Sequence, residues 1–234
     1  MVKIYIFELT SAICDKDKSF FLSELYSSER KALPKQRGKG FELSLIGKIL
    51  AKRIVSNATL TPAKKVLIGK TKLGKPIIKK PCNMNLDISI SHSGSYLAVG
   101  ICDSGKIGVD IEFLKDIDFR IFGNCLSVSE ERYINSGKEI TQRLEKFYEI
   151  WTRKEACLKA LGMGLQKPLP ITQFYPGLIK PRAEVVHNSQ QYYLSTLKED
   201  KFVLSVCTTK SITEEPIYTK LSLDKLCPIV VDVK

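Results

Sequence analysis

Three short apolar runs between residues 86 and 113 constrain the fold more than any other feature of the chain. They read LDISI (86–90), YLAVGIC (96–102) and IGVDIEF (107–113), and the short segments SHSGS and DSGK separate them. Apolar and β-branched runs favour strands, and short turns rich in glycine and serine connect neighbouring antiparallel strands. We therefore expect an antiparallel meander of three strands in the middle of the chain.

Helical periodicity appears on both sides of this segment. Apolar residues in 40–55 recur at intervals of three and four, which predicts a helix. Ser127 precedes Glu130 by three positions, the spacing of a capping box, and predicts the start of a second helix. A longer helix is predicted over 144–161, ending near Gly162.

The ends of the chain add further strands. Residues 2–9 alternate between apolar and polar side chains, and 190–197 and 201–208 resemble a closing strand pair. The order of strand, helix and strands then occurs twice. We expect an α+β fold of two similar halves, residues 1–105 and 106–234, each with a mainly antiparallel sheet packed by helices.

Positive charge is concentrated in one part of the chain. The formal net charge is +12, and residues 30–80 contain fifteen lysine and arginine residues but one acidic residue, Glu42. Such a region is either a solvated surface or a surface that binds anions, nucleic acid included. Because no nucleic-acid-binding motif accompanies it, we expect no nucleic acid partner.

The cysteines and the hydropathy pattern indicate a cellular compartment. The seven cysteines are scattered, odd in number and never in CxxC spacing, which argues against a disulfide framework or a zinc ribbon. The apolar start MVKIYIFELT is interrupted at Glu8, and no run approaches the length of a membrane span. We expect a soluble cytoplasmic protein that does not enter the membrane.

Two carboxylates stand close together in the run IGVDIEFL (107–114). Asp110 and Glu112 point to the same face of a strand, where they would repel each other, so a positive group is expected between them. Glu155 on the predicted helix could complete a site for a hard cation such as Mg²⁺. Glu155 and Lys159 also have the spacing of an exposed helical ion pair, which is the simpler interpretation of those two residues alone.

The segment SISHSG (89–94) has two interpretations. It is either a hairpin turn with a local hydrogen bond from His92, or a turn in which Ser91 and His92 donate to a phosphate. The segment lacks the GxSxG arrangement of a nucleophile elbow, which disfavours hydrolase chemistry.

Four motifs in this order resemble those of a known enzyme family. They are GKP (74–76), ISHSG (90–94), GVDIE (108–112) and WTRKEACLKALGMGL (151–165). Together they resemble the 4′-phosphopantetheinyl transferases, specifically the longer, surfactin-type group. The resemblance implies a monomer of two similar α+β halves, with coenzyme A bound in an active-site cleft between them.

The resemblance also implies a role for individual residues. Asp110, Glu112 and Glu155 would hold Mg²⁺, for which Mn²⁺ is a possible substitute. Glu155, together with Lys159, would act in catalysis. The implied contacts to coenzyme A are Lys31 at the 3′-phosphate, Lys75, Ser91 and His92 in the phosphate-binding loops, and Lys154 and Lys159 near the pyrophosphate.

The implied reaction is attack by a serine hydroxyl of an apo acyl or peptidyl carrier protein on the β-phosphate of coenzyme A, giving the holo carrier and 3′,5′-ADP. Two other classes of function stay open at this point. A coenzyme A or nucleotide-binding protein without transferase activity would need no acidic triad. An RNA-binding module would show affinity that falls steeply with salt.

Overall fold

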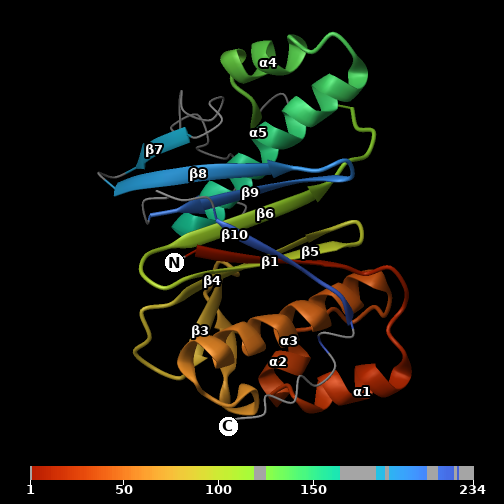
Figure 1. Cartoon of the computed structure of the whole chain (residues 1–234), viewed down its shortest axis with the longest axis vertical. Coiled ribbons are helices and arrows are strands. Elements are labelled where there is room, and N and C mark those ends of the chain that lie inside the picture. The colour runs from red at the N-terminus through yellow and green to blue at the C-terminus, as the bar shows by residue number, and fades with distance from the viewer. Residues whose placement is uncertain are drawn as a thin grey trace.

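The computed structural model describes residues 2–118, 125–163, 183–187, 190–209, 216–223 and 226. It confirms the predicted α+β class, with helices packed on mainly antiparallel sheets (Figure 1). The helices are α1 (Asp15–Ser23), α2 (Ser27–Lys31), α3 (Lys39–Thr59), α4 (Val128–Asn135) and α5 (Ile140–Leu161), with a 3₁₀ turn at Ala63–Lys65. The strands are β1 (Val2–Glu8), β2 (Leu67–Lys70), β3 (Pro76–Lys80), β4 (Asp87–Ser93), β5 (Tyr96–Cys102), β6 (Ile107–Phe113), β7 (Ala183–His187), β8 (Gln190–Lys198), β9 (Phe202–Thr208) and β10 (Ile217–Leu221).

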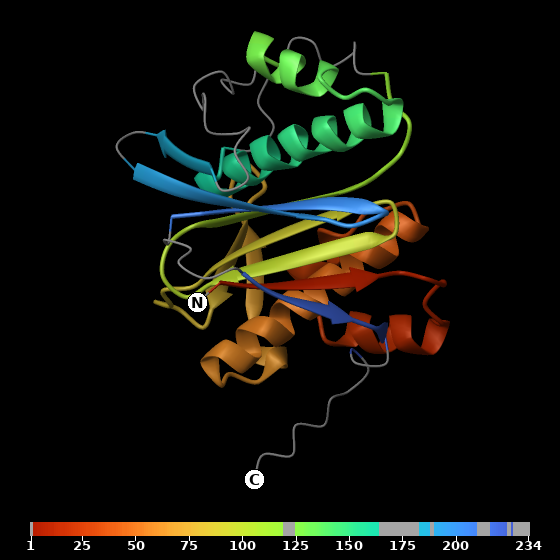
Figure 2. The ribbon, with the colours of Figure 1, turned by 45° about the horizontal axis from the view of Figure 1, so that its top comes forward.

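The described strands form two four-stranded sheets and one hairpin. The first sheet has the order β10-β1-β5-β4, the second has the order β6-β9-β8-β7, and β2 pairs with β3. All neighbours are antiparallel except β1 and β10, which are parallel. The two sheets lie between the helices α1–α3 on one side and α4–α5 on the other (Figure 2).

Apolar side chains fill each interface between these layers. Ile4 and Ala98 of the first sheet pack with Val109, Leu204 and Val206 of the second. A separate cluster joins the opposite face of the first sheet to α3, and others join α5 to the second sheet. Because each sheet is covered on both faces, its central strands are almost fully buried, as β5 and β9 are.

The expected three-strand meander is wrong in its last strand. β4 and β5 pair as expected, but β6 pairs with β9 and starts the second sheet. β6 instead crosses the face of β5 so closely that a Cβ added at Gly100 would lie 2.4 Å from Cγ2 of Val109. The DSGK segment therefore links two packed sheets.

The chain returns to its first sheet near its end. β10 pairs with β1 along Lys3 to Phe7. The division into halves 1–105 and 106–234 stays a prediction, and β10 is an element of the second range that lies in the sheet of the first. None of the described helices is long and apolar enough to cross a membrane.

Part of the positive charge of residues 30–80 has a structural role. Lys52 on α3 is buried and forms an ion pair of 3.1 Å with Glu29, which is equally buried. Arg53 forms an ion pair of 3.2 Å with Glu24. Not all of the positive charge of this region is therefore available to solvent or to an anion.

Candidate active site

The candidate site is built where β4 lies beside β6 without pairing with it. Polar side chains occupy every second position of β4, so they share one face of the strand. The first two bond to the backbone of β6: Asp87 accepts from the Ile107 N–H (2.8 Å), and Ser89 accepts from the Val109 N–H (2.9 Å). The next two bond to its carboxylates: Ser91 donates to Asp110 (2.8 Å), and Ser93 donates to Glu112 (2.5 Å). This polar ladder fixes the two carboxylates of β6.

Asp110 is buried, and its two carboxylate oxygens differ. Oδ1 accepts hydrogen bonds from Ser91 Oγ and from the Lys159 ammonium, the latter at 2.7 Å. Oδ2 has no hydrogen-bond partner among the described residues. Burial raises the pKa of Asp110, and the positive charge of Lys159 opposes that rise. The carboxylate thus has one oxygen in use and one available for a further positive group.

Glu155 lies on α5, one turn before Lys159. Its Oε1 is buried and has no hydrogen-bond partner among the described residues. Burial raises the pKa of Glu155 to about 7, and the negative charges of Asp110 and Glu112 contribute to the rise. Burial and Asp110 likewise raise the pKa of Glu112. The three predicted carboxylates are therefore close enough to interact electrostatically.

This arrangement fits a cation but is not a formed metal centre. Within the described part of the chain, no group of three or more His, Cys, Asp or Glu residues is arranged to hold a metal ion. The orphaned oxygens of Asp110 and Glu155 are buried, and buried carboxylates need a positive or donating partner. The donor set is all oxygen, as Mg²⁺ prefers.

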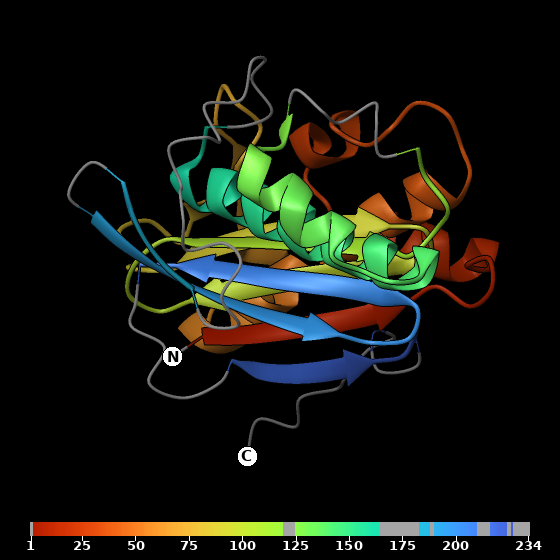
Figure 3. The same cartoon turned by 90° about the horizontal axis from the view of Figure 1, so that it is seen from above.

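A cavity of about 210 Å³ opens beside these groups. Its lining includes Gly74 and Pro76 of the GKP loop, Ser89 of β4, and Glu155 and Lys159 of α5. Figure 3 shows α5 lying across the second sheet. The C-terminal end of α5 contributes Leu158 and Gly162 to the same cavity. A larger cavity of about 310 Å³ near Tyr96 contains none of the predicted site residues.

Two family models match consecutive parts of the chain. The model described as "4'-phosphopantetheinyl transferase superfamily" matches residues 106–207, which contain β6 and α5. The model described as "4'-phosphopantetheinyl transferase, N-terminal" matches residues 14–102. The chain belongs to the 4′-phosphopantetheinyl transferase superfamily. This confirms the resemblance drawn from the four motifs and makes the protein a transferase.

Relatives of this transferase carry the same family name. The chain is 25% identical over 192 residues to "4'-phosphopantetheinyl transferase gsp" of Aneurinibacillus migulanus, covering 81% of this chain and 78% of that protein. It is 27% identical to "4'-phosphopantetheinyl transferase Sfp" of Bacillus subtilis (strain 168), covering 72% and 74% of the two chains. With "4'-phosphopantetheinyl transferase ffp" of Bacillus subtilis the identity is 33%, over 54% of each chain.

The other predicted coenzyme A contacts of the transferase are spread over several elements. Ser91 is buried in the polar ladder, where its hydroxyl bonds Asp110 and Lys159. His92 is exposed, yet neighbouring atoms partly desolvate its ring and lower its pKa, and the charges of Lys159 and Lys70 lower it further. Lys31 is exposed at the end of α2.

Two predicted phosphate contacts point elsewhere. Lys154 is next to Glu155 on α5, and adjacent residues on a helix face directions about 100° apart. The Lys154 ammonium is buried and donates to Glu130 (2.7 Å) and to the Cys125 carbonyl (2.5 Å). Its predicted contact with the pyrophosphate finds no support in this geometry. The Lys75 ammonium likewise has other partners, Asp87 and two backbone carbonyls, so its contact with a phosphate stays a prediction.

Three members of the polar ladder were missed from the sequence. Asp87, Ser89 and Ser93 hold β6 as directly as Ser91 does. The signal was present in DISISHS (87–93), where polar residues recur with the period of a strand. What the sequence did not reveal is that this polar face meets β6 of the other sheet.

Replacing Lys154 tests its structural role. Lys154→Met should lower the free energy of unfolding by about 3–5 kcal/mol, because it leaves the buried Glu130 carboxylate unpaired. Chemical denaturation measures the effect, and Lys138→Met, at an exposed position, is the control. Adding Glu130→Met to the variant should restore part of the loss. Unchanged stability with a raised KM for coenzyme A would instead support the predicted phosphate contact.

Proposed function

We propose that this transferase moves the 4′-phosphopantetheine group of coenzyme A to a serine of an apo acyl or peptidyl carrier protein, with holo carrier and 3′,5′-ADP as products. Membership of the family supports the reaction class. The observation that carries the assignment of the site is the pair of orphaned buried oxygens on Asp110 and Glu155, beside the Lys159 ammonium and the 210 Å³ cavity.

The mouth of the site suits the phosphates of coenzyme A. The Lys159 side chain is 28% exposed, and its charge and that of Lys70 both act on His92, so positive potential gathers at this opening. Phosphates are attracted to such a region and accept charge-assisted hydrogen bonds there. His92 and Lys159 are the proposed contacts, while Lys31 is proposed for the 3′-phosphate.

Asp110, Glu112 and Glu155 are the residues that would hold Mg²⁺ or Mn²⁺. When bound, the ion would neutralise charge on the pyrophosphate. Glu155, with a pKa near 7, is suited to accept the proton of the attacking serine hydroxyl. As the serine oxygen bonds to phosphorus and the bond to 3′,5′-ADP breaks, Lys159 would stabilise the charge on the phosphoryl oxygens.

The proposed protein partner is an acidic carrier. Exposed basic residues of the N-terminal region would steer it, and this steering would weaken as salt increases. These residues are Lys35, Arg37, Lys39, Lys64, Lys65, Lys70, Lys72, Lys79 and Lys80. We further propose that the transferase acts as a monomer in the cytoplasm.

The intact mass of a carrier protein tests the reaction directly. After incubation of apo carrier with the transferase, coenzyme A and Mg²⁺, we expect a mass gain of one phosphopantetheine group, lost when EDTA is present. A carrier with its acceptor serine replaced by alanine is the control. Coenzyme A binding without a mass gain on acyl and peptidyl carriers would favour the non-catalytic binder and would refute the transfer.

A further inference from the structure

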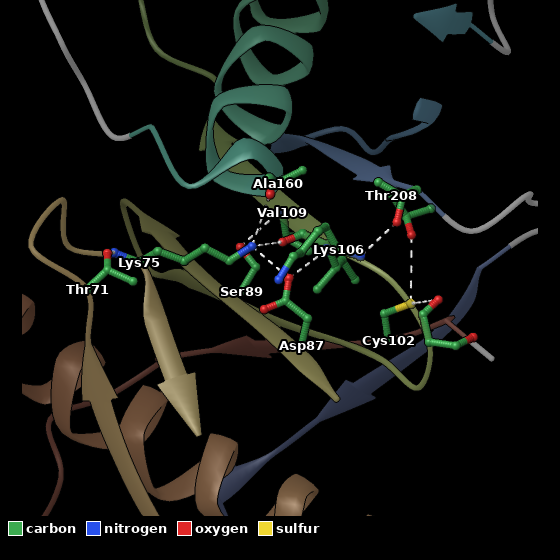
Figure 4. Close-up of polar contacts among 12 residues, drawn as sticks. Thr71, Lys75, Asp87, Ser89, Cys102, Lys106, Val109, Ala160 and Thr208 are labelled. Atoms are coloured by element: carbon green, nitrogen blue, oxygen red, sulfur yellow. Dashed lines mark hydrogen bonds and ion pairs between the residues drawn. The ribbon is translucent and has the colours of Figure 1, made fainter. Parts of the chain in front are cut away.

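Hydrogen bonds fix the backbone of Lys75 in the loop between β2 and β3. The Thr71 N–H donates to the Lys75 carbonyl (2.9 Å), and the Lys75 N–H donates to Thr71 Oγ1 (3.1 Å). Gly74, with φ of 91°, permits this tight loop. The side chain then runs away from Thr71 toward β4 and α5, as Figure 4 shows, and it is only 10% exposed.

The Lys75 ammonium has an acceptor for each of its three protons. It donates to Asp87 Oδ2 at 2.6 Å, to the Ile107 carbonyl at 3.1 Å and to the Ala160 carbonyl at 3.2 Å. A lysine ammonium has three donors and no more. In this arrangement Lys75 therefore has no proton left for a phosphate.

Asp87 accepts hydrogen bonds from both Lys75 and the start of β6. The same Oδ2 accepts the Ile107 N–H at 2.8 Å, so Lys75 and Asp87 together hold both backbone groups of the first residue of β6. Ala160 lies in the last turn of α5, where helix carbonyls lack partners and a positive charge is favourable. The ion pair thus ties the GKP loop, β4, β6 and the end of α5 to one another.

We propose that Lys75 and Asp87 are a positioning pair that holds the C-terminal end of α5 against β6. Ala160 directly follows Lys159, and Ile107 precedes Asp110 by three residues, so the pair fixes the helix and strand whose groups meet in the site. Neither side chain needs to touch coenzyme A for this role. The inference rests on the proposed function for its kinetic consequences, but its structural consequence stands independently.

A double-mutant cycle separates positioning from phosphate contact. Lys75→Met and Asp87→Asn should each lower kcat about 10–100-fold, because small misplacement of reacting groups costs this much. KM for coenzyme A should change less than about threefold, and the double variant should be no slower than the worse single variant. Lys138→Met, at an exposed position outside the site and outside the basic N-terminal region, should match the wild type.

The opposite pattern would overturn the proposal. A phosphate contact predicts that Lys75→Met raises KM with kcat retained, and that Asp87→Asn leaves KM unchanged or lowers it. Rates are compared at a temperature well below the lowest melting temperature of the set, so that unfolding does not enter the comparison.

Hydrogen exchange tests the same pair without any activity. In the ligand-free protein, both Lys75→Met and Asp87→Asn should speed exchange in the last turn of α5 by about tenfold or more and leave α3 unchanged. Unchanged exchange at the end of α5 in both variants would refute the positioning role. An inactive wild type with the expected exchange pattern would refute the proposed function and leave the pair supported.

Discussion

Glu155→Gln should abolish phosphopantetheine transfer while the transferase stays folded. Glutamine keeps the shape of the side chain but cannot accept the serine proton and is a poorer ligand for a cation. A general base alone contributes about 10²–10⁴-fold, so we expect a loss of at least this size in kcat. The intact-mass assay of the carrier measures the loss, and Glu145→Gln, exposed on the same helix, should behave like the wild type.

The direction in which Glu155→Gln changes the stability of the fold can be predicted from the pKa of Glu155. The folded-state pKa of Glu155 is raised from 4.5 to about 7, so the folded protein binds more protons than the unfolded chain between these pH values. Ionisation of Glu155 therefore costs stability as the pH rises from about 4.5 to 7, and the cost persists above 7. Glutamine removes that cost.

Thermal unfolding in EDTA at pH 8 measures this effect. The melting temperature of Glu155→Gln should equal or exceed that of the wild type, and its stability should fall less between pH 4.5 and 7. Normal turnover by the variant would refute both the base and the cation-ligand roles of Glu155. Inactivity accompanied by a clear loss of stability would show a structural role instead.

The local elements of this protein were predictable because their signals are short in range. Capping by Ser127 and Glu130, the left-handed Gly162 that ends α5, and the alternation of β4 each depend on a few neighbouring residues. The pairing of β6 was not predictable in this way. Its partner β9 is about a hundred residues away, and a meander satisfies the same local pattern.

In the candidate site, too, the residue types could be predicted from the sequence, but the partners of their side chains could not. Burial raises the pKa of both Asp110 and Glu155, as expected for carboxylates in an apolar strand and on an apolar helix, which need a positive partner, and their roles at a metal ion stay predictions. Lys75 and Lys154 lie within motifs of the family, and in the ligand-free structure their ammonium groups form ion pairs with Asp87 and Glu130, so their contacts with coenzyme A stay predictions. A motif gives the type of residue at a position, whereas the packing of the fold determines which groups its side chain contacts.

Gly108→Ala should destabilise the transferase strongly and displace α5. A Cβ added at Gly108 of β6 would lie 1.9 Å from the Ala156 carbonyl oxygen and 2.4 Å from the Ala160 nitrogen. Both atoms belong to the backbone of α5, so no side-chain rotation can relieve the clash. Overpacking typically costs 1–3 kcal/mol where side chains can move, and we expect about 3 kcal/mol or more here.

Any relief of this clash must move α5 away from β6. Such a shift separates Lys159 and Glu155 from Asp110, so transfer should fall further than the unfolded fraction explains. Denaturation and intact-mass assays measure the two effects. Gly69→Ala is the matched control, because the three atoms nearest to its new Cβ all belong to the flexible side chain of Lys79 in another strand. Wild-type stability and turnover in Gly108→Ala would contradict the close contact of α5 with β6, and with it the reason why a glycine precedes the acidic pair.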